Sequence, residues 1–327
     1  MATALPIARD HPVMGGHYAI FTPPINEFFG MVCEWIDSNI SGGFVYGPPR
    51  QGKSRAVKYW IEHLLAERYG ALLPFFHMNY KYHDRFSEVE FLAELLQACH
   101  HRFAQTGTRM TKLDRLVKLF ATRARNAGSN RVVLMIDEAQ NMREQSYRTL
   151  CNLQNELDEL GIQLTVISVG TQDLVYQHSV FSQGGDLHLV GRFMLRQAAF
   201  RGLRCVQELA YVLNAYDMET EWPVGSGLSY THYFFPRAFE TGFRLSLFAP
   251  EMWRIYEELA PPKLQSNLEV AMEHVAKPIE TLFRERAGDS PTINFTLDEV
   301  TRAIEISRYR TYMQSIAVMP AGGRHGK

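Results

Sequence analysis

The feature that most constrains this chain is the segment from Gly47 to Ser54, which reads GPPRQGKS. It follows a short apolar run at residues 44–46 and precedes a helical pattern from about residue 53 to residue 69. The pattern GxxxxGK followed by Ser or Thr, placed between a strand and a helix, is typical of a loop that binds phosphate. Its glycines let consecutive backbone N–H groups turn inward around an anion, above the positive end of the helix dipole. The segment therefore predicts a nucleotide-phosphate site of the Walker A kind.

Individual roles within this loop follow from the side chains present. Lys53 is expected to reach the β- and γ-phosphates, and the Ser54 hydroxyl is expected to bind Mg²⁺. ATP and Mg²⁺ are thus the ligands that the loop predicts. The other residues expected to contact the nucleotide are Gly47, Pro48, Arg50, Gln51, Gly52 and Arg55.

A second motif, which ends in two acidic residues, lies further along the chain at Val132 to Glu138 and reads VVLMIDE. An apolar strand that ends in two carboxylates is the Walker B pattern. Asp137 is expected to hold Mg²⁺ through water, and Glu138 to orient and polarise the water that attacks the γ-phosphate. An acidic pair after a strand also serves as a loop start or a helix cap, so the prediction depends on the pairing with the first motif.

The run Leu164 to Thr171 is a third strand-like segment, about 30 residues after the Walker B pattern. A polar side chain at its end could hydrogen-bond the attacking water or the γ-phosphate. Thr171 is predicted to have that sensor role, with Gln172 and Ser168 as alternatives. A threonine in this position also commonly caps the following helix.

Three arginines are candidates for contacts with the nucleotide. Arg192 and Arg196 follow a glycine-containing loop, and in a ring-forming ATPase one arginine at this stage reaches the γ-phosphate bound by the neighbouring subunit. Arg244 lies in the later helical region, where such ATPases often carry an arginine for the nucleotide of the same subunit; Arg237 is the alternative there. A solvated or ion-paired arginine is the competing interpretation for the first two.

The order of the predicted elements indicates an α/β domain followed by a helical region. With 327 residues and 46% hydrophobic residues, the chain can bury a large core. Strands and helices alternate as in a parallel sheet with crossover helices, and the strand signal disappears beyond about residue 198. The expected strands are 44–46, 72–78, 131–136 and 163–169, and the expected helices are 25–40, 53–69, 87–105, 111–127, 143–160, 203–216, 236–260, 264–287 and 297–317. The predicted organisation is an extended N-terminal arm at 1–24, an α/β nucleotide-binding domain at 25–200, a helical lid at 201–317 and a flexible tail at 318–327.

Composition excludes several classes of protein. The 34 basic and 35 acidic residues nearly balance, so any contact with DNA must come from local patches rather than from a positive field. The four cysteines show no metal-ligand spacing, and neither zinc nor a disulfide framework is indicated. No run of about 18 apolar residues and no signal sequence is present, which predicts a cytoplasmic protein without a membrane partner.

Taken in order, the Walker A motif, the Walker B motif with its glutamate, the Gly-Thr strand end, a later arginine and the helical C-terminal region resemble the AAA+ superfamily. Within it, the chain is most similar to the TniB/TnsC group of transposition regulators, over roughly residues 10 to 260. The AAA+ resemblance implies an αβα sandwich with a small helical lid. The segments that carry the closer resemblance are residues 11–24, IDEAQNM at 136–142, SVGT at 168–171 and ELAYVL at 208–213. Residues 217–235 match no motif of the group, and the DEAQN stretch is shared with related secretion-associated and IstB-like ATPases.

This resemblance implies an ATPase that oligomerises as a ring or helical filament on double-stranded DNA. Such a protein links a target-selection protein, TniQ-like or equivalent, to a transposase, and ATP hydrolysis controls its disassembly. The alternative is another AAA+ ATPase, such as a helicase loader or a secretion-associated ATPase. A third hypothesis is a scaffold that binds nucleotide without turnover, against which the intact Lys53, Asp137 and Glu138 weigh.

Candidate DNA contacts lie in two short segments that contain basic residues. A ring or filament on duplex DNA would use phosphate contacts, which give affinity without sequence specificity. Lys81 and Arg85 follow the second predicted strand among aromatic residues, and Arg109 and Lys112 precede or begin a predicted helix. Both segments are equally compatible with a solvated surface.

Overall fold

The computed structural model describes residues 8–318, and these form two compact units. The first, here called the α/β unit, comprises residues 27–49 and 53–200; the second, the helical unit, comprises residues 8–26, 50–52 and 201–318. Each unit has its own hydrophobic core. The predicted tail lies outside the described residues except for its first residue, and so do residues 1–7 of the predicted arm.

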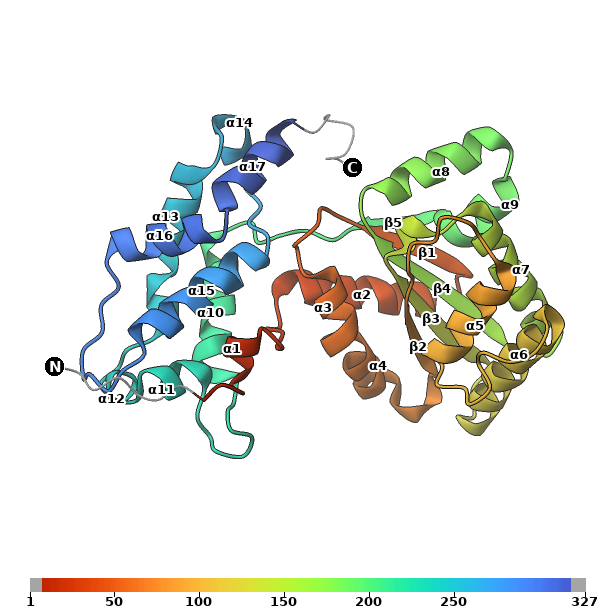
Figure 1. The fold of residues 1–327 in the computed structure, drawn as a ribbon, viewed down its shortest axis with the longest axis horizontal. Coiled ribbons are helices and arrows are strands. Elements are labelled where there is room, and N and C mark those ends of the chain that lie inside the picture. Colours follow the sequence, from red (N-terminus) through yellow and green to blue (C-terminus); the bar gives the residue numbers. More distant parts are fainter. Residues whose placement is uncertain (1–7, 319–327) are drawn as a thin grey trace. The chain divides into compact units, whose positions relative to one another are not determined.

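The α/β unit is built on a parallel sheet with the strand order β2-β3-β4-β1-β5 (Figure 1). The four strands predicted from the sequence are present with slightly shifted ends. The fifth strand was not predicted, because its four residues are largely exposed and lack an apolar run. The strands are β1 Gly42–Tyr46, β2 Phe75–Asn79, β3 Arg131–Asp137, β4 Gln163–Gly170 and β5 Arg196–Ala199.

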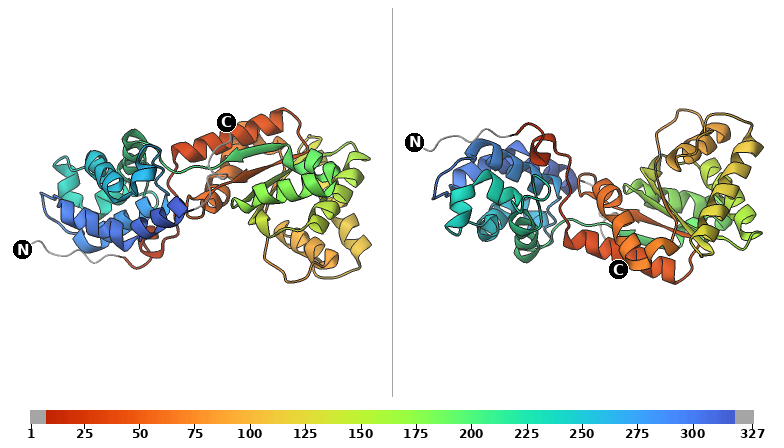
Figure 2. Two further views of the ribbon diagram at one scale, coloured as in Figure 1. Left: turned by 90° about the horizontal axis from the view of Figure 1, so that it is seen from above. Right: turned by 90° about the horizontal axis from the view of Figure 1, so that it is seen from below.

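Helices cover both faces of this sheet, as Figures 1 and 2 show. Side chains of successive strand residues point to opposite faces, so an apolar strand such as β3 can be buried on both sides. Val132, Leu134 and Ile136 join one core cluster, which includes residues of α5, α6 and α7. The opposite face is covered by α2 and by the helix that begins with α3. The bounds are α2 Pro23–Asp37, α3 Lys53–Ala56 continuing through the π-helical turn Val57–Ile61 into α4 Glu62–Tyr69, α5 Glu88–Ala98, α6 Arg109–Asn126 and α7 Glu144–Asp158.

The helix expected at 87–105 is shorter in the structure and is followed by a loop. The Ser87 hydroxyl caps α5 by accepting from the Glu90 backbone N–H. The helix ends at Ala98, and His100 takes a left-handed φ of 55°, which α-helical continuation does not allow. Residues 99–108 then lead to α6, whose N-cap is Thr108. After β4 the chain forms α8 Asp173–Gly184, α9 Leu187–Leu189 and a π-helical turn at Val190–Met194.

The helical unit consists of α-helices packed around a core rich in aromatic residues. The helix expected at 236–260 is broken where Gly242 takes a φ of 102° and Arg244 is extended, and the carboxylate of buried Asp217 accepts from the Leu245 and Ser246 N–H groups that begin the next turn. The helices of this unit are α1 Pro12–Gly15, α10 Val206–Met218, α11 Tyr230–Phe234, α12 Pro236–Glu240, α13 Ala249–Leu259, α14 Pro262–Gln265, α15 Glu273–Arg286, α16 Leu297–Ile306 and α17 Tyr309–Val318, with a short 3₁₀ turn at Leu245–Phe248. Two further 3₁₀ turns, Gly70–Leu72 and Ala139–Asn141, belong to the α/β unit. None of the helices in the described part of the chain is long and apolar enough to cross a membrane.

The N-terminal segment from residue 8 is packed against the helical unit, whereas the sequence predicts an extended arm. Val13, Tyr18 and Ile20 are buried in the core of this unit. The Tyr18 and Tyr216 hydroxyls lie 2.8 Å apart. His11 is buried among aromatic rings of the segment that matches no family motif, residues 217–235; the rings are those of Trp222, Tyr230, Tyr233 and Phe234. That segment therefore has a structural role in holding the N-terminal segment.

Candidate functional site

The candidate site lies at the carboxyl ends of three neighbouring strands of the α/β unit. Because β4 lies between β1 and β3, the loop after β1, the end of β4 and the acidic end of β3 meet at one edge of the sheet. The Gly47 N–H donates to the Gly170 carbonyl at 3.3 Å, which joins the start of the Walker A loop to the end of β4. Ligands of open α/β sheets bind at this edge, where successive loops diverge.

The Walker A loop has the backbone that a phosphate-binding turn requires. Gly52 takes a φ of 104°, and Arg50 takes a φ of 71°, which is uncommon for a residue with a side chain. Lys53 begins α3, as the motif predicts. Its Nζ donates to the carbonyl oxygens of Gly47 at 2.7 Å and Pro48 at 2.8 Å, so the ammonium group folds back over its own loop. The loop residues thus fit the polyphosphate of a nucleotide.

Burial changes the pKa of the Lys53 ammonium group. It lowers the pKa of the Lys53 ammonium group to about 8, while the Asp137 and Glu138 carboxylates act in the opposite direction and favour the charged form. These two Walker B carboxylates therefore act electrostatically on the Walker A lysine. The fold thus places these carboxylates near a lysine from a distant part of the sequence.

The two Walker B carboxylates differ in their surroundings. Asp137 is the last residue of β3 and is buried, with 3% of its surface exposed. Its Oδ1 accepts from the Glu138 backbone N–H at 2.9 Å. Glu138 is half-buried and lies in the left-handed region, with φ 56° and ψ 30°, so the chain turns sharply after the strand. The Ser54 hydroxyl and the Asp137 carboxylate are hard oxygen donors of the type that Mg²⁺ prefers.

Glu138 is held by Gln140, a residue for which the sequence predicts no catalytic role. The Gln140 Nε2 donates to Glu138 Oε2 at 2.6 Å, and the Gln140 Oε1 accepts from the Thr171 backbone N–H at 3.1 Å. Gln177 donates to the Gln140 carbonyl at 2.7 Å. The sequence signal was present in the stretch DEAQN, but it identified a family resemblance rather than a contact.

The structure places Thr171 beside this network, with its hydroxyl engaged elsewhere. Thr171 Oγ1 donates to the Asp173 carboxylate at 3.0 Å and accepts from the Asp173 backbone N–H at 3.4 Å, which is a local contact at the start of α8. These local contacts fit the helix-capping alternative, and the sensor role of Thr171 stays a prediction. Ser168 is buried within β4, and Gln172 is the N-cap residue of α8.

The three candidate arginines are spread over both units. Arg192 lies in the π-helical turn after α9 and is half-buried, whereas Arg196 is exposed on β5, where it pairs with Gly43 of β1. Arg244 belongs to the helical unit, and its guanidinium lies 3.6 Å from the centre of the Phe239 ring. It also donates to the Phe239 carbonyl at 2.8 Å. These contacts orient Arg244 within its own unit.

The four candidate DNA contacts fall into two groups. Lys81 and Arg85 are exposed on the loop that follows β2. Arg109 pairs with Glu88 at 2.7 Å, and Lys112 is buried, with its Nζ donating to the Ala104 carbonyl at 2.6 Å. In this conformation the Lys112 ammonium points into the protein and stabilises the loop before α6. The first pair is therefore the better placed to meet a phosphate backbone.

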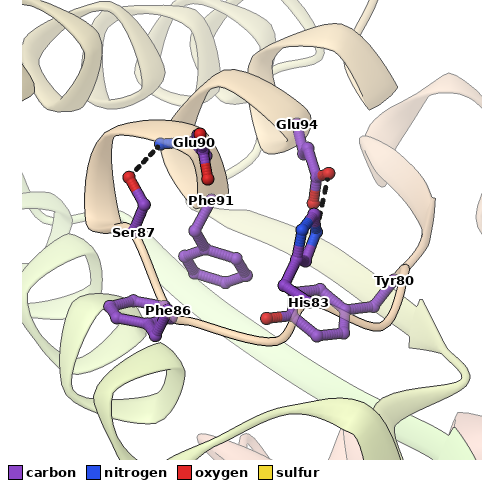
Figure 3. Close-up of a pocket in the computed structure, with 7 residues that line it drawn as sticks. All are labelled: Tyr80, His83, Phe86, Ser87, Glu90, Phe91 and Glu94. Carbon is purple, nitrogen blue, oxygen red and sulfur yellow. Dashed lines mark hydrogen bonds and ion pairs between the residues drawn. The ribbon is translucent and has the colours of Figure 1, made fainter.

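A pocket lies between the loop after β2 and α5, as Figure 3 shows. Its cavity of about 10 Å³ is enough for a single water molecule and far too small for a nucleotide. Within it, His83 Nε2 and Glu94 Oε1 lie 3.0 Å apart. The side chains that line this small pocket therefore pack the loop against α5. The lining residues are Tyr80, His83, Phe86, Ser87, Glu90, Phe91 and Glu94.

Comparison with known proteins identifies the type of domain. Residues 37–176 match the family model of an AAA domain. Among curated proteins, none matches this sequence. The fold is similar to that of the Aeropyrum pernix ORC2 protein in its ADPNP-ADP complexes, with a TM-score of 0.58, 11% identity, and coverage of 91% of this chain and 72% of that one. Aeropyrum pernix ORC1 in complex with DNA gives a TM-score of 0.51 and 15% identity over 94% and 72% of the two chains.

A third solved structure has the same fold. Drosophila ORC bound to DNA gives a TM-score of 0.50 with 13% identity, covering 90% of this chain and 67% of that one. Sequence identities this low establish the fold alone. Together with the domain match, they confirm the predicted α/β fold of the AAA+ type with C-terminal helices. ATP binding and hydrolysis are the activities that this domain supports.

Proposed function

We propose that this AAA+ ATPase is a regulator of DNA transposition that oligomerises on double-stranded DNA and links a target-selection protein to a transposase. ATP hydrolysis would control its disassembly. The ATPase part rests on the domain match and on the site described above. The transposition part is supported by the TniB/TnsC-like segments in the sequence, which include the IDEAQNM stretch at 136–142.

Hydrolysis would use the residues at the sheet edge. The Lys53 ammonium, which now donates to two loop carbonyls, would turn to the β- and γ-phosphates of ATP. Bound Mg²⁺ would neutralise charge on the phosphate oxygens, with Ser54 and Asp137 as the residues that fit it. The Glu138 carboxylate would orient the attacking water and accept its proton. Thr171 would contact this water or the γ-phosphate, and Arg192 or Arg196 would supply the charge in trans.

The observation that carries the DNA proposal is the attachment of the loop after β2 to the Walker B segment. The Tyr80 N–H donates to the carbonyl of Asp137 at 3.0 Å. On the other side of the loop, the guanidinium of Arg143 donates to the carbonyls of His83 at 3.1 Å and Asp84 at 2.7 Å. Arg143 is only five residues beyond Glu138 in sequence. A loop that carries exposed Lys81 and Arg85 is thus joined at two points, Tyr80 and His83–Asp84, to the segment that would hydrolyse ATP.

The comparisons are compatible with a protein that works on duplex DNA. Two of the similar folds were solved with DNA bound. They also favour a second candidate, an AAA+ ATPase with another DNA-associated role such as helicase loading, because it would share every catalytic residue and differ only in its partner. The two candidates differ in their DNA preference, since a helicase loader is expected to favour single-stranded DNA.

The direct test is electron microscopy of the negatively stained protein with a non-hydrolysable ATP analogue, with and without duplex DNA. We expect filaments or stacked rings that need both ligands. Particles that look the same with and without duplex DNA would rule out the transposition-regulator proposal but not the ATPase activity. Assembly on single-stranded DNA alone would favour the helicase-loader candidate.

The loop after β2 can be tested separately. We expect Lys81→Ala and Arg85→Ala each to weaken binding to duplex DNA of any sequence, and each to reduce the slope of log K against log salt concentration by about one, because each removes one phosphate contact. Fluorescence anisotropy at several salt concentrations measures both quantities. Lys118→Ala, which removes an exposed lysine from α6, is the matched control. Equal salt slopes for the Lys81 variant and this control would show that the loop does not contact the backbone.

A further inference from the structure

We infer that Gln140 is a positioning residue for Glu138: its side-chain amide holds the Glu138 carboxylate and joins it to the backbone at the end of β4. The inference rests on Glu138 acting as the base in ATP hydrolysis. It assigns a role to a residue that lies outside both Walker motifs and that reacts with neither ATP nor water.

The two ends of one amide make the connection. The Nε2 of Gln140 donates to the Glu138 carboxylate at 2.6 Å, which is a short, charge-assisted hydrogen bond. The Oε1 of the same amide accepts from the Thr171 N–H at 3.1 Å. An amide can donate at one end and accept at the other, and a carboxylate at this position would only accept. Glutamine is therefore matched to both partners, and its orientation is set by them.

Surrounding residues hold Gln140 in this position. Gln177 of α8 donates through its Nε2 to the carbonyls of Gln140 at 2.7 Å and Met142 at 2.9 Å. With the Gln140 amide in this position, a Cβ atom at residue 170 would lie only 2.3 Å from the Gln140 Oε1. The end of β4 thus needs a glycine to let the amide approach. The Gln140 side chain thus contacts the turn after β3 and the backbone just after β4, while Gln177 of α8 holds the Gln140 main chain.

The consequence concerns the orientation of the base. Glu138 lies outside the strand with a left-handed backbone, so its strand does not fix the direction of its carboxylate. The hydrogen bond from Gln140 leaves the carboxylate with one preferred direction. Because the Gly47 N–H donates to the Gly170 carbonyl, the residue before Thr171 is also bonded to the Walker A loop. If nucleotide binding shifts the hydrogen-bonded pair Gly47 and Gly170, the Thr171 N–H would move with it. Through Gln140 the Glu138 carboxylate would then move as well.

A positioning role predicts a particular kinetic effect. We expect Gln140→Ala to lower kcat for ATP hydrolysis by about ten- to a hundredfold, since a misplaced catalytic group loses rate on this scale. We expect KM for ATP and the affinity for a fluorescent ADP analogue to stay within about twofold, because Gln140 is not expected to contact the nucleotide. Gln140→Met keeps the length of the side chain but has neither the NH₂ donor nor the C=O acceptor of the amide, so it should behave like Gln140→Ala. It also controls for the loss of packing that a shorter side chain would cause.

The matched control is Gln145→Glu, a change at an exposed glutamine five residues away. We expect it to leave kcat unchanged. Gln140→Glu makes the same change in charge at the proposed position, keeps an acceptor for the Thr171 N–H and loses the donor to Glu138. We expect a lower kcat for this variant than for the control.

A double-mutant cycle with Glu138→Gln distinguishes positioning from a general structural role. If Gln140 acts through the carboxylate, Gln140→Ala should change the single-turnover rate of the Glu138→Gln enzyme by less than about twofold. An equal loss of rate in both backgrounds, or a rise in KM with unchanged kcat, would overturn the inference. Wild-type turnover by Glu138→Gln alone would instead refute Glu138 as the base and leave the Gln140 contacts without a catalytic meaning.

Discussion

At the residue scale, Lys53 and Glu138 serve different steps, and their substitutions should separate those steps. We expect Lys53→Ala to abolish ATP binding at concentrations that saturate the wild type, because the loop loses its cation for the β- and γ-phosphates. We expect Glu138→Gln to keep ATP binding and to lower kcat by about a hundred- to ten-thousandfold, because the attacking water loses its base. Isothermal titration calorimetry and a phosphate-release assay measure the two effects. Normal ATP affinity in the Lys53 variant would contradict the assignment of the Walker A loop.

Glu138→Gln should also prolong the assembled state. If hydrolysis controls disassembly, the variant trapped with ATP should remain on duplex DNA after dilution, while the wild type dissociates.

At the scale of elements, the start of α6 depends on Lys112, which the sequence suggests as a DNA contact. The Lys112 Nζ donates to the Ala104 carbonyl, and the side chain is 1% exposed. We expect Lys112→Ala to lower the free energy of unfolding by about 2 kcal/mol, because a buried carbonyl loses its donor and the buried stem leaves a void. Chemical denaturation measures the loss, with Lys118→Ala as the exposed control on the same helix. An unchanged stability together with weaker DNA binding would show that Lys112 turns outward to a phosphate.

At the scale of the whole molecule, two buried histidines should make the helical unit sensitive to acid. Burial lowers the pKa of His11 and of His274 to about 4, against a usual value of 6.5. Between these two values the unfolded chain binds the proton and the folded chain does not, so stability rises with pH and is lost as the pH falls from about 6.5 to about 4. The full loss amounts to about 3 kcal/mol for each histidine.

This acid sensitivity can be assigned by substitution. We expect His274→Gln to reduce the difference in the free energy of unfolding between pH 7 and pH 5, because one of the titrating groups is removed. Denaturation followed by tryptophan fluorescence measures the difference, with signal from Trp222 and Trp253 of the helical unit and from Trp35 and Trp60 of the α/β unit. His63→Gln is the control, since His63 is exposed on α4. A pH dependence in the His274 variant equal to that of the wild type would show that its burial carries no such cost.

The sequence by itself determined the two Walker motifs, the order of the elements from β1 to β4 and the helical character of the C-terminal part. These features depend on short stretches of adjacent residues: a glycine-rich turn between a strand and a helix, or an apolar run that ends in carboxylates. Each of these features forms from residues that are adjacent in the chain, so the local sequence is sufficient to predict it. The short β5 escaped prediction, because Arg196–Ala199 has no apolar pattern and becomes a strand only by pairing with β1.

Only the tertiary structure decided which side chains meet. The local sequence suggested that Lys112 contacts DNA and that the N-terminal segment is an extended arm. In the structure the Lys112 ammonium binds the Ala104 carbonyl, and Val13, Tyr18 and Ile20 are buried in the core of the helical unit. The same holds for Gln140, whose partner Thr171 lies just after another strand, 31 residues away. Such contacts form because the parallel sheet brings the ends of β3 and β4 to one edge, and strand pairing between distant segments leaves no periodic pattern in the chain.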